Sequence, residues 1–264
     1  MQDSGVFQRQ FGHGADSALA IHCGLGHSGA WRGVAEALDD LLTVKAFDLP
    51  GHGRSPVWDD SKDQEFQAVA TDWARVVLDR RPSHIIGHSF GGSVALRLAV
   101  ESPELVKTLT LIEPVYFAAV HGTRIWTVHQ SREAPFREAV ANNDPAGAAE
   151  CFTRIWGDGT PWDMLPVRTR EDLTGRIGLI EAQAPGLNDD PAGALAPGVL
   201  ERIAVPVLLL EGAQSPPIVP AILDVLQGRL PNTRRACVPA AGHMVAISHP
   251  ADVAQEIRSM ISQP

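Results

Sequence analysis

A serine with a glycine two residues away on either side is the residue of this sequence best suited to nucleophilic chemistry. Ser89 lies in "GHSFG" (87–91), directly after the apolar run "HII" and directly before a segment with helical spacing. A serine hydroxyl becomes an effective nucleophile when a tight strand-to-helix turn presents it to a base, and small neighbours admit the strained backbone of that turn. We therefore predict that Ser89 is a nucleophile. Phe90 starts the helix, so its N–H is the expected first donor to an oxyanion.

A histidine near the C-terminus fits the role of the base. His243 lies in "AAGHM", on a loop shortly before the last helical segment. In a sheet that presents a serine in this way, the base follows the last strand, so we predict that His243 accepts the Ser89 proton. His249 competes for this role. It directly precedes Pro250 at the start of the helix, and this favours a capping or packing role for it.

These motifs, in this order, resemble the α/β-hydrolase fold family from about residue 15 to the C-terminus. The segments that carry the resemblance are "IHCGLGHSGAW", "FDLPGHGRS", "IIGHSFGG", "LTLIEP", "PVLLLEG" and "AAGHM". In the family, the third residue of a His-Gly-x loop donates the second oxyanion N–H. This loop reads His22-Cys23-Gly24 here, so the resemblance implies Gly24, with Leu25 as the fallback if the loop is offset by one residue.

The carboxylate that orients the base is missing from its usual place. In the family it lies in a Gly-x-x-Asp pattern beyond the "LLLEG" strand, but this chain reads Gly-Ala-Gln-Ser there and ends the pattern at Ser215. Some relatives, including the haloalkane dehalogenases, place the acid after the preceding strand. That strand is "TLTLIEP", so Glu113 is the predicted acid. Glu211 is the alternative, and a dyad helped by water, or Asp224, is left open.

Strands that end in loops must position these residues. Alternating strand and helix patterns predict an α/β fold: a mostly parallel, doubly covered sheet of the α/β-hydrolase type. Five apolar runs have the character of buried strands: 17–26, 41–53, 83–92, 108–114 and 205–212.

Residues 114–200 break this alternation and have the pattern of short helices rich in Trp, Arg, Pro and Gly. We predict that they form a helical cap inserted into a core domain of residues 1–113 and 201–264. Aromatic side chains of a cap could line an apolar pocket above the nucleophile. Trp126 and Trp156 are candidates for substrate contact, although packing of the cap on the core explains each of them equally well.

Composition excludes several other classes of protein. The chain has 22 Lys and Arg against 31 Asp and Glu, a formal charge of −9, and no long basic cluster, so we expect no nucleic-acid partner. No segment resembles a signal peptide or the roughly 20 apolar residues of a membrane span, so we predict a cytoplasmic protein with no membrane partner.

The cysteines and the other possible ligands indicate no metal or other cofactor. Cys23, Cys151 and Cys237 lack Cys-x-x-Cys spacing. The oligomeric state is not specified.

The predicted reaction is acyl transfer to water. A serine hydrolase would cleave an ester-type bond of a small, partly apolar substrate through an acyl-enzyme, as a carboxylic ester hydrolase. The serine at position 89 argues against dehalogenase and epoxide hydrolase chemistry, which use an aspartate in this family. Hydrolysis of carbon–carbon, thioester, amide or lactone bonds and perhydrolysis are alternatives on the same site. A ligand-binding, receptor-like protein without catalysis is the alternative of another class, and only the missing acid favours it.

Overall fold

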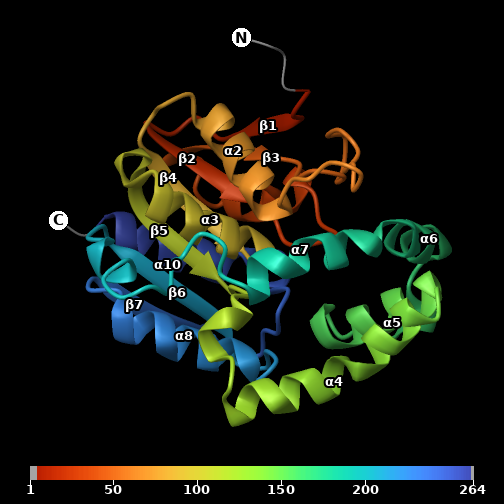
Figure 1. The fold of residues 1–264 in the computed structure, drawn as a ribbon. Coiled ribbons are helices and arrows are strands. Elements are labelled where there is room, and N and C mark those ends of the chain that lie inside the picture. The colour runs from red at the N-terminus through yellow and green to blue at the C-terminus, as the bar shows by residue number, and fades with distance from the viewer. Residues whose placement is uncertain (1–4, 263–264) are drawn as a thin grey trace.

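A mostly parallel sheet with helices on both faces forms the centre of the molecule (Figure 1). The computed structural model describes residues 5–262, and within them the sheet has seven strands in the order β1-β3-β2-β4-β5-β6-β7. Strand β1 is antiparallel to β3, and the other neighbouring strands of this described sheet are parallel. The predicted fold class is therefore confirmed. The outermost residues of the predicted core domain, 1–4 and 263–264, lie outside the described range.

All five predicted strands are present: β2 (Asp16–Ile21), β3 (Leu42–Phe47), β4 (Ser83–His88), β5 (Val106–Ile112) and β6 (Val207–Gly212). The sheet also contains β1 (Gln8–Phe11) and β7 (Thr233–Val238), which the apolar pattern does not predict. Both are edge strands with largely half-buried or exposed residues. An edge strand is not enclosed on all sides, so it needs no continuous apolar run.

Helices cover both faces of this sheet, and side chains that alternate along the strands divide the core between the two layers. On β2, Leu19 and Ile21 pack in the layer under α2 (Phe66–Leu78), α3 (Phe90–Glu101) and α8 (Ile218–Arg229). Ala18 and Ala20 pack in the opposite layer, under α1 (Arg32–Glu36), α9 (Val245–Ser248) and α10 (Pro250–Ile261). Alternation of this kind follows from the two-residue period of a strand.

Helices α4 to α7 follow β5 and lie to one side of the sheet in Figure 1. Their bounds are α4 (Arg124–Ala141), α5 (Pro145–Trp156), α6 (Val167–Arg176) and α7 (Gly178–Asn188). Helix α7 packs against α2 and α3, and α4 packs against α8. The segment 114–200 is thus mainly helical and touches the core, while its division from the core as a separate domain stays a prediction. No helix within residues 5–262 is both long enough and apolar enough to cross a membrane.

Candidate active site

Ser89 lies at the sharp turn where β4 passes into α3. Its φ of 56° and ψ of −119° belong to a region that residues with a side chain rarely adopt. The Ser89 N–H donates to the carbonyl of Ile112 at 2.9 Å, and the Ser89 carbonyl accepts from the N–H groups of Gly92 and Ser93. The neighbouring strand and the first turn of the helix therefore hold the strained residue in place.

The glycines of "GHSFG" are required by close contacts between backbones. A Cβ on Gly87 would lie 2.2 Å from the carbonyl oxygen of Gly91, and a Cβ on Gly91 would lie 2.2 Å from that of Ile21. Both distances are far below a van der Waals contact, and the atoms that would be hit belong to the backbone, which cannot move aside as a side chain can. The motif is therefore explained by packing between α3 and the strands β2 and β4.

His243 connects Ser89 to Glu113. Its Nε2 lies 2.9 Å from Ser89 Oγ, and its Nδ1 lies 2.9 Å from Glu113 Oε2. His243 is 4% exposed and Glu113 is fully buried. A carboxylate that accepts from Nδ1–H leaves Nε2 with the lone pair, so this arrangement suits removal of a proton from the serine hydroxyl.

Glu113 is held by the strand next to its own. Its N–H donates to the carbonyl of Leu210 at 2.7 Å, and its Oε1 accepts from the Gly212 N–H at 2.6 Å and from the Ser215 hydroxyl at 2.5 Å. Oε2 is left for His243. Ser215, which occupies the usual position of the acid, is thus a hydrogen-bond donor to the carboxylate one strand away.

The alternative acids face a different partner. Glu211 pairs with Arg235, with Oε1 2.7 Å from Nη2, and Arg235 also pairs with Asp224. Burial raises the pKa of Glu211, and Arg235 opposes this effect. Neither carboxylate hydrogen-bonds to His243 in the described structure, so the structure does not support Glu211 or Asp224 as the acid.

Gly24, Phe90 and Ser89 line a common cavity of about 50 Å³. Phe90 is the first residue of α3, so its N–H has no partner within that helix. The Gly24 N–H donates to no other group of residues 5–262, whereas the Leu25 N–H donates to His52 Nε2 at 3.0 Å. Leu25 is therefore not available as the fallback oxyanion donor, and Gly24 remains.

Buried histidines hold the loops around this cavity. His22 and His52 each donate from Nδ1 to a nearby carbonyl, of Cys23 and Pro50 respectively, at 2.7 Å. The Nε2 atoms accept backbone N–H groups, from Leu49 to His22 and from Leu25 to His52. Burial lowers the pKa of His22 to about 3 and that of His52 to about 4, so both rings are neutral at pH 7.

His88 is a supporting residue that the sequence analysis does not identify. Its Nε2 donates to the backbone carbonyl of His243 at 2.8 Å. Burial and the neighbouring His243 lower the pKa of His88 to about 3, so the ring is neutral. Its place directly before Ser89 in "GHSFG" is the available signal, because a side chain next to the nucleophile lies near the base. His88 therefore positions the loop that carries His243.

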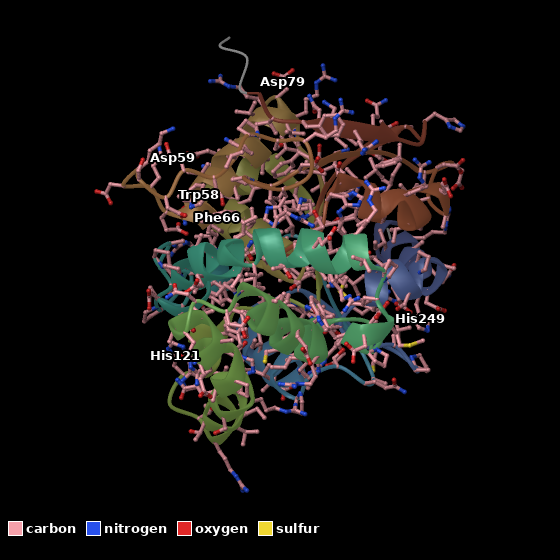
Figure 2. The ribbon with its side chains drawn as sticks, turned by 90° about the vertical axis from the view of Figure 1, so that its right-hand side faces the viewer. Trp58, Asp59, Phe66, Asp79, His121 and His249 are labelled. Carbon is pink, nitrogen blue, oxygen red and sulfur yellow. The ribbon has the colours of Figure 1, made fainter. Side chains whose placement is uncertain are left out.

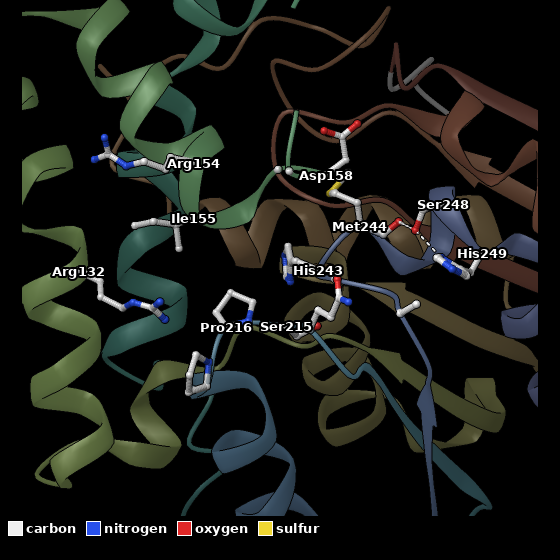
Figure 3. Close-up of a pocket in the computed structure, with 16 residues that line it drawn as sticks. Arg132, Arg154, Ile155, Asp158, Ser215, Pro216, His243, Met244, Ser248 and His249 are labelled. Carbon is white, nitrogen blue, oxygen red and sulfur yellow. Dashed lines mark hydrogen bonds between the residues drawn. The ribbon is translucent and has the colours of Figure 1, made fainter. Parts of the chain in front are cut away.

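A second cavity, of about 630 Å³, opens beside His243 (Figure 3). Arg132 of α4 and Arg154 of α5 lie on its helical side, and the loops of Ser215 and His243 form the other. His249 also lines it, but its Nδ1 is hydrogen-bonded to Ser248 Oγ at 2.8 Å. His249 is thus near the site, whereas the ring nitrogen next to Ser89 Oγ belongs to His243.

The two tryptophans named as candidates for substrate contact differ in their relation to the site. Trp156 lines the smaller cavity, and its ring packs edge-on against His243 with centroids 4.7 Å apart. Trp126 instead packs against His121, with centroids 4.4 Å apart, and against Phe117. Figure 2 shows His121, the neighbour of Trp126, on the opposite side of the view from His249, which lines the larger cavity beside His243. The structure thus brings Trp156 to the site and leaves Trp126 packed against His121 and Phe117.

The cysteines in the described part of the chain carry free thiols. Burial raises the pKa of Cys23 to about 11, so this thiol, next to Gly24, is neutral at pH 7. Between residues 5 and 262, no group of three or more His, Cys, Asp and Glu side chains is arranged to hold a metal ion.

Known proteins share this sequence pattern and fold. Residues 18–256 match the model of the alpha/beta hydrolase family. A pimeloyl-[acyl-carrier protein] methyl ester esterase of Nitrosomonas europaea is 30% identical over 90% of this chain and 92% of its own length. Lipase LipV of Mycobacterium tuberculosis is 30% identical over 96% of each chain. A solved putative lipase of Acinetobacter baumannii, 19% identical, covers 98% of this chain and 91% of its own with a TM-score of 0.74, a likeness of fold.

Proposed function

This chain belongs to the α/β hydrolase family, and we propose that Ser89, His243 and Glu113 are the residues with which it hydrolyses carboxylic esters. The observation that carries the assignment is the continuous hydrogen-bonded series from Ser89 Oγ through His243 to Glu113, with 2.9 Å at each step. Relatives named as esterase and lipase, similar over nearly the whole chain, support ester hydrolysis.

The mechanism follows from the donors and acceptors around Ser89. His243 Nε2 takes the hydroxyl proton while Oγ attacks the ester carbonyl, and the Phe90 and Gly24 N–H groups stabilise the oxyanion. Glu113 stabilises the imidazolium that forms. His243 then gives its proton to the leaving alcohol, and a water activated by the same imidazole hydrolyses the acyl-enzyme.

The buried carboxylate at His243 also bears on the non-catalytic alternative. That alternative rests on the missing acid after β6, and Glu113 supplies an acid from the adjacent strand. We further propose that residues 114–200 act as the cap of the site and that the substrate is a small molecule. Location in the cytoplasm stays a prediction of the sequence.

Covalent labelling tests the proposed nucleophile. We expect a fluorophosphonate probe to label the wild-type protein on Ser89, and Ser89→Ala to abolish both labelling and hydrolysis of a short-chain 4-nitrophenyl ester. Ser93→Ala is the matched control, because Ser93 Oγ donates to the carbonyl of Phe90 within α3 and its hydroxyl is not at the turn. Labelling of wild type no faster than of Ser89→Ala would refute the assignment.

A further inference from the structure

Gln183 presents a side-chain amide without a partner beside the proposed oxyanion donor. It lies on α7, is 2% exposed, and its Nε2 has no hydrogen-bond partner among the described residues. A Cβ on Gly24 would lie 2.9 Å from Gln183 Oε1 and 3.7 Å from Nε2. The amide therefore borders the space in which a bound ester carbonyl would lie.

The positions of the cavities identify the part of the ester that would meet Gln183. The cavity of about 50 Å³ is lined by Ser89, Gly24, Phe90 and Gln183, whereas the cavity of about 630 Å³ is lined by His243. His243 gives its proton to the leaving oxygen, so the leaving group lies toward the larger cavity. The acyl group then occupies the smaller cavity, next to Gln183.

The remaining wall of this smaller cavity is mostly apolar, with one further polar side chain from the cap. Glu133 Oε1 accepts from Trp156 Nε1 at 3.4 Å, and its Oε2 lies 3.3 Å from His129 Nε2. A carboxylate in the wall disfavours an acyl group that carries its own negative charge. The apolar part consists of Val115, Phe117, Phe152, Trp156, Ile180 and Leu187, together with Phe90.

A buried amide that lacks a partner is costly, so a ligand that supplies the partner gains affinity. An amide both donates and accepts, and a hydroxyl is the smallest uncharged group that can do the same in return. The small volume of the cavity restricts the acyl chain to a short one.

We propose that Gln183 selects short acyl groups that carry a hydroxyl close to the ester carbonyl. This inference rests on the proposed function, because it takes Ser89 as the nucleophile and His243 as the donor to the leaving group. Gln183 is then a specificity-determining residue that binds the substrate's acyl hydroxyl and takes no part in proton transfer.

The test is a ratio of two substrates. kcat/KM is measured for the 4-nitrophenyl esters of 3-hydroxybutyric acid, as separate enantiomers, and of butyric acid. We expect the ratio of the better hydroxybutyrate ester to the butyrate ester to fall about tenfold in Gln183→Met, which keeps the chain length and removes the hydrogen bonds. The control is Gln130→Met, the same change on an exposed residue of α4, for which we expect the wild-type ratio.

The ratio separates recognition from damage to the fold or to catalysis. A ratio equal in wild type and Gln183→Met would overturn the inference, and so would an equal loss for both esters, which indicates an effect on the carbonyl or on folding. If Gln183→Met does not fold, Gln183→Asn replaces it in the test. Its shorter side chain withdraws the amide from the cavity, so the ratio of hydroxybutyrate to butyrate ester should also fall. If hydrolysis of the butyrate ester depends on Ser89 but the ratio does not change in Gln183→Met, the proposed function stands. Only the role of Gln183 is then refuted. Failure of wild type on both esters refutes both.

Discussion

At the scale of single residues, the carboxylate that we propose to orient His243 comes from an unusual position, Glu113 directly after β5. Glu113 directly follows β5, and Glu211 lies near the end of the adjacent parallel strand β6; the residues before them, Ile112 and Leu210, are partners in the sheet. Moving the acid from one strand end to the next displaces it by about 4.8 Å. Glu113 has a longer side chain than the aspartate usual in the family, and two donors hold its Oε1, so Oε2 reaches His243.

Replacement of the acids should separate the two candidates. We expect Glu113→Gln to lower kcat for ester hydrolysis by about three to four orders of magnitude, because an amide does not hold the imidazole in the required tautomer or stabilise its charge. Glu211→Gln is the matched control. It should lower kcat by less than about tenfold, because its carboxylate pairs with Arg235 and not with the base. Full activity of Glu113→Gln in steady-state assays would refute the assignment.

At the scale of elements, the junction of β4 and α3 decides where the nucleophile stands. The helix begins at Phe90, directly after Ser89, and its first turn lies against the carbonyl groups of Ile21 and His22 at the end of β2. Helix and strand can approach this closely only where no Cβ intervenes. The same approach brings Phe90 and Gly24 to one cavity, so backbone packing and the proposed oxyanion binding have a common cause.

An alanine in the elbow tests this packing. We expect Gly91→Ala to lower the free energy of unfolding by about 3 kcal/mol or to prevent folding, because its Cβ would lie 2.2 Å from a backbone oxygen. Gly228→Ala, also within a helix, is the control. Outside its own helix, its Cβ would meet no atom of the described residues within 4 Å, so stability should rise by about 0.5–1 kcal/mol. Urea denaturation measures both, and equal effects would contradict the packing argument.

At the scale of the whole molecule, the loops at the carboxyl edge of the sheet are held by neutral histidines. His22, His52 and His88 are almost fully buried. Each ring hydrogen-bonds to a backbone group of another segment of the chain. The rings of His22 and His52 join the loops after β2 and β3 to each other, and the ring of His88 joins the end of β4 to the loop of His243. Protonation of any of them would place a charge in buried surroundings. The Asp48 carboxylate offsets this cost for His22 and His52 only in part, so the folded molecule resists protonation.

Stability should therefore fall on mild acidification. In the folded state the pKa values of these three histidines are about 3 to 4, below the ordinary value of 6.5 that applies when the chain unfolds. The unfolded chain binds more protons between these values, so their contribution is complete above pH 6.5 and is lost as the pH falls. We expect a loss of about 2 kcal/mol per histidine between pH 7 and 5.

Urea denaturation at half-unit steps of pH measures the free energy of unfolding between pH 7 and 5. Most carboxylates stay ionised in this range, so the loss reports mainly on the histidines. His13→Gln is the control, because His13 is exposed and the variant should keep the wild-type slope. A free energy of unfolding that is constant from pH 7 to 5 would contradict the assignment of these histidines as buried and neutral.

The sequence by itself determined the features that depend on neighbouring residues or on strand order. "GHSFG" between a strand and a helix indicates Ser89 and Phe90, because the turn is local. His243 follows from its place after the last strand, and the alternation of strands and helices predicts the sheet. The edge strands β1 and β7 are missed, because exposed edges permit polar residues that hide the apolar pattern.

The tertiary structure decided what depends on the direction of side chains and on contacts distant in the sequence. Glu113 and Glu211 both lie close to the ends of apolar strands, and only the fold turns one toward His243 and the other toward Arg235. Gly24 and Leu25 are adjacent, yet the bond from Leu25 to His52 removes one of them as a donor. Gln183 reaches the site from α7, a helix that packs on α2 and α3. Such contacts join segments that lie far apart along the chain, so no local pattern records them.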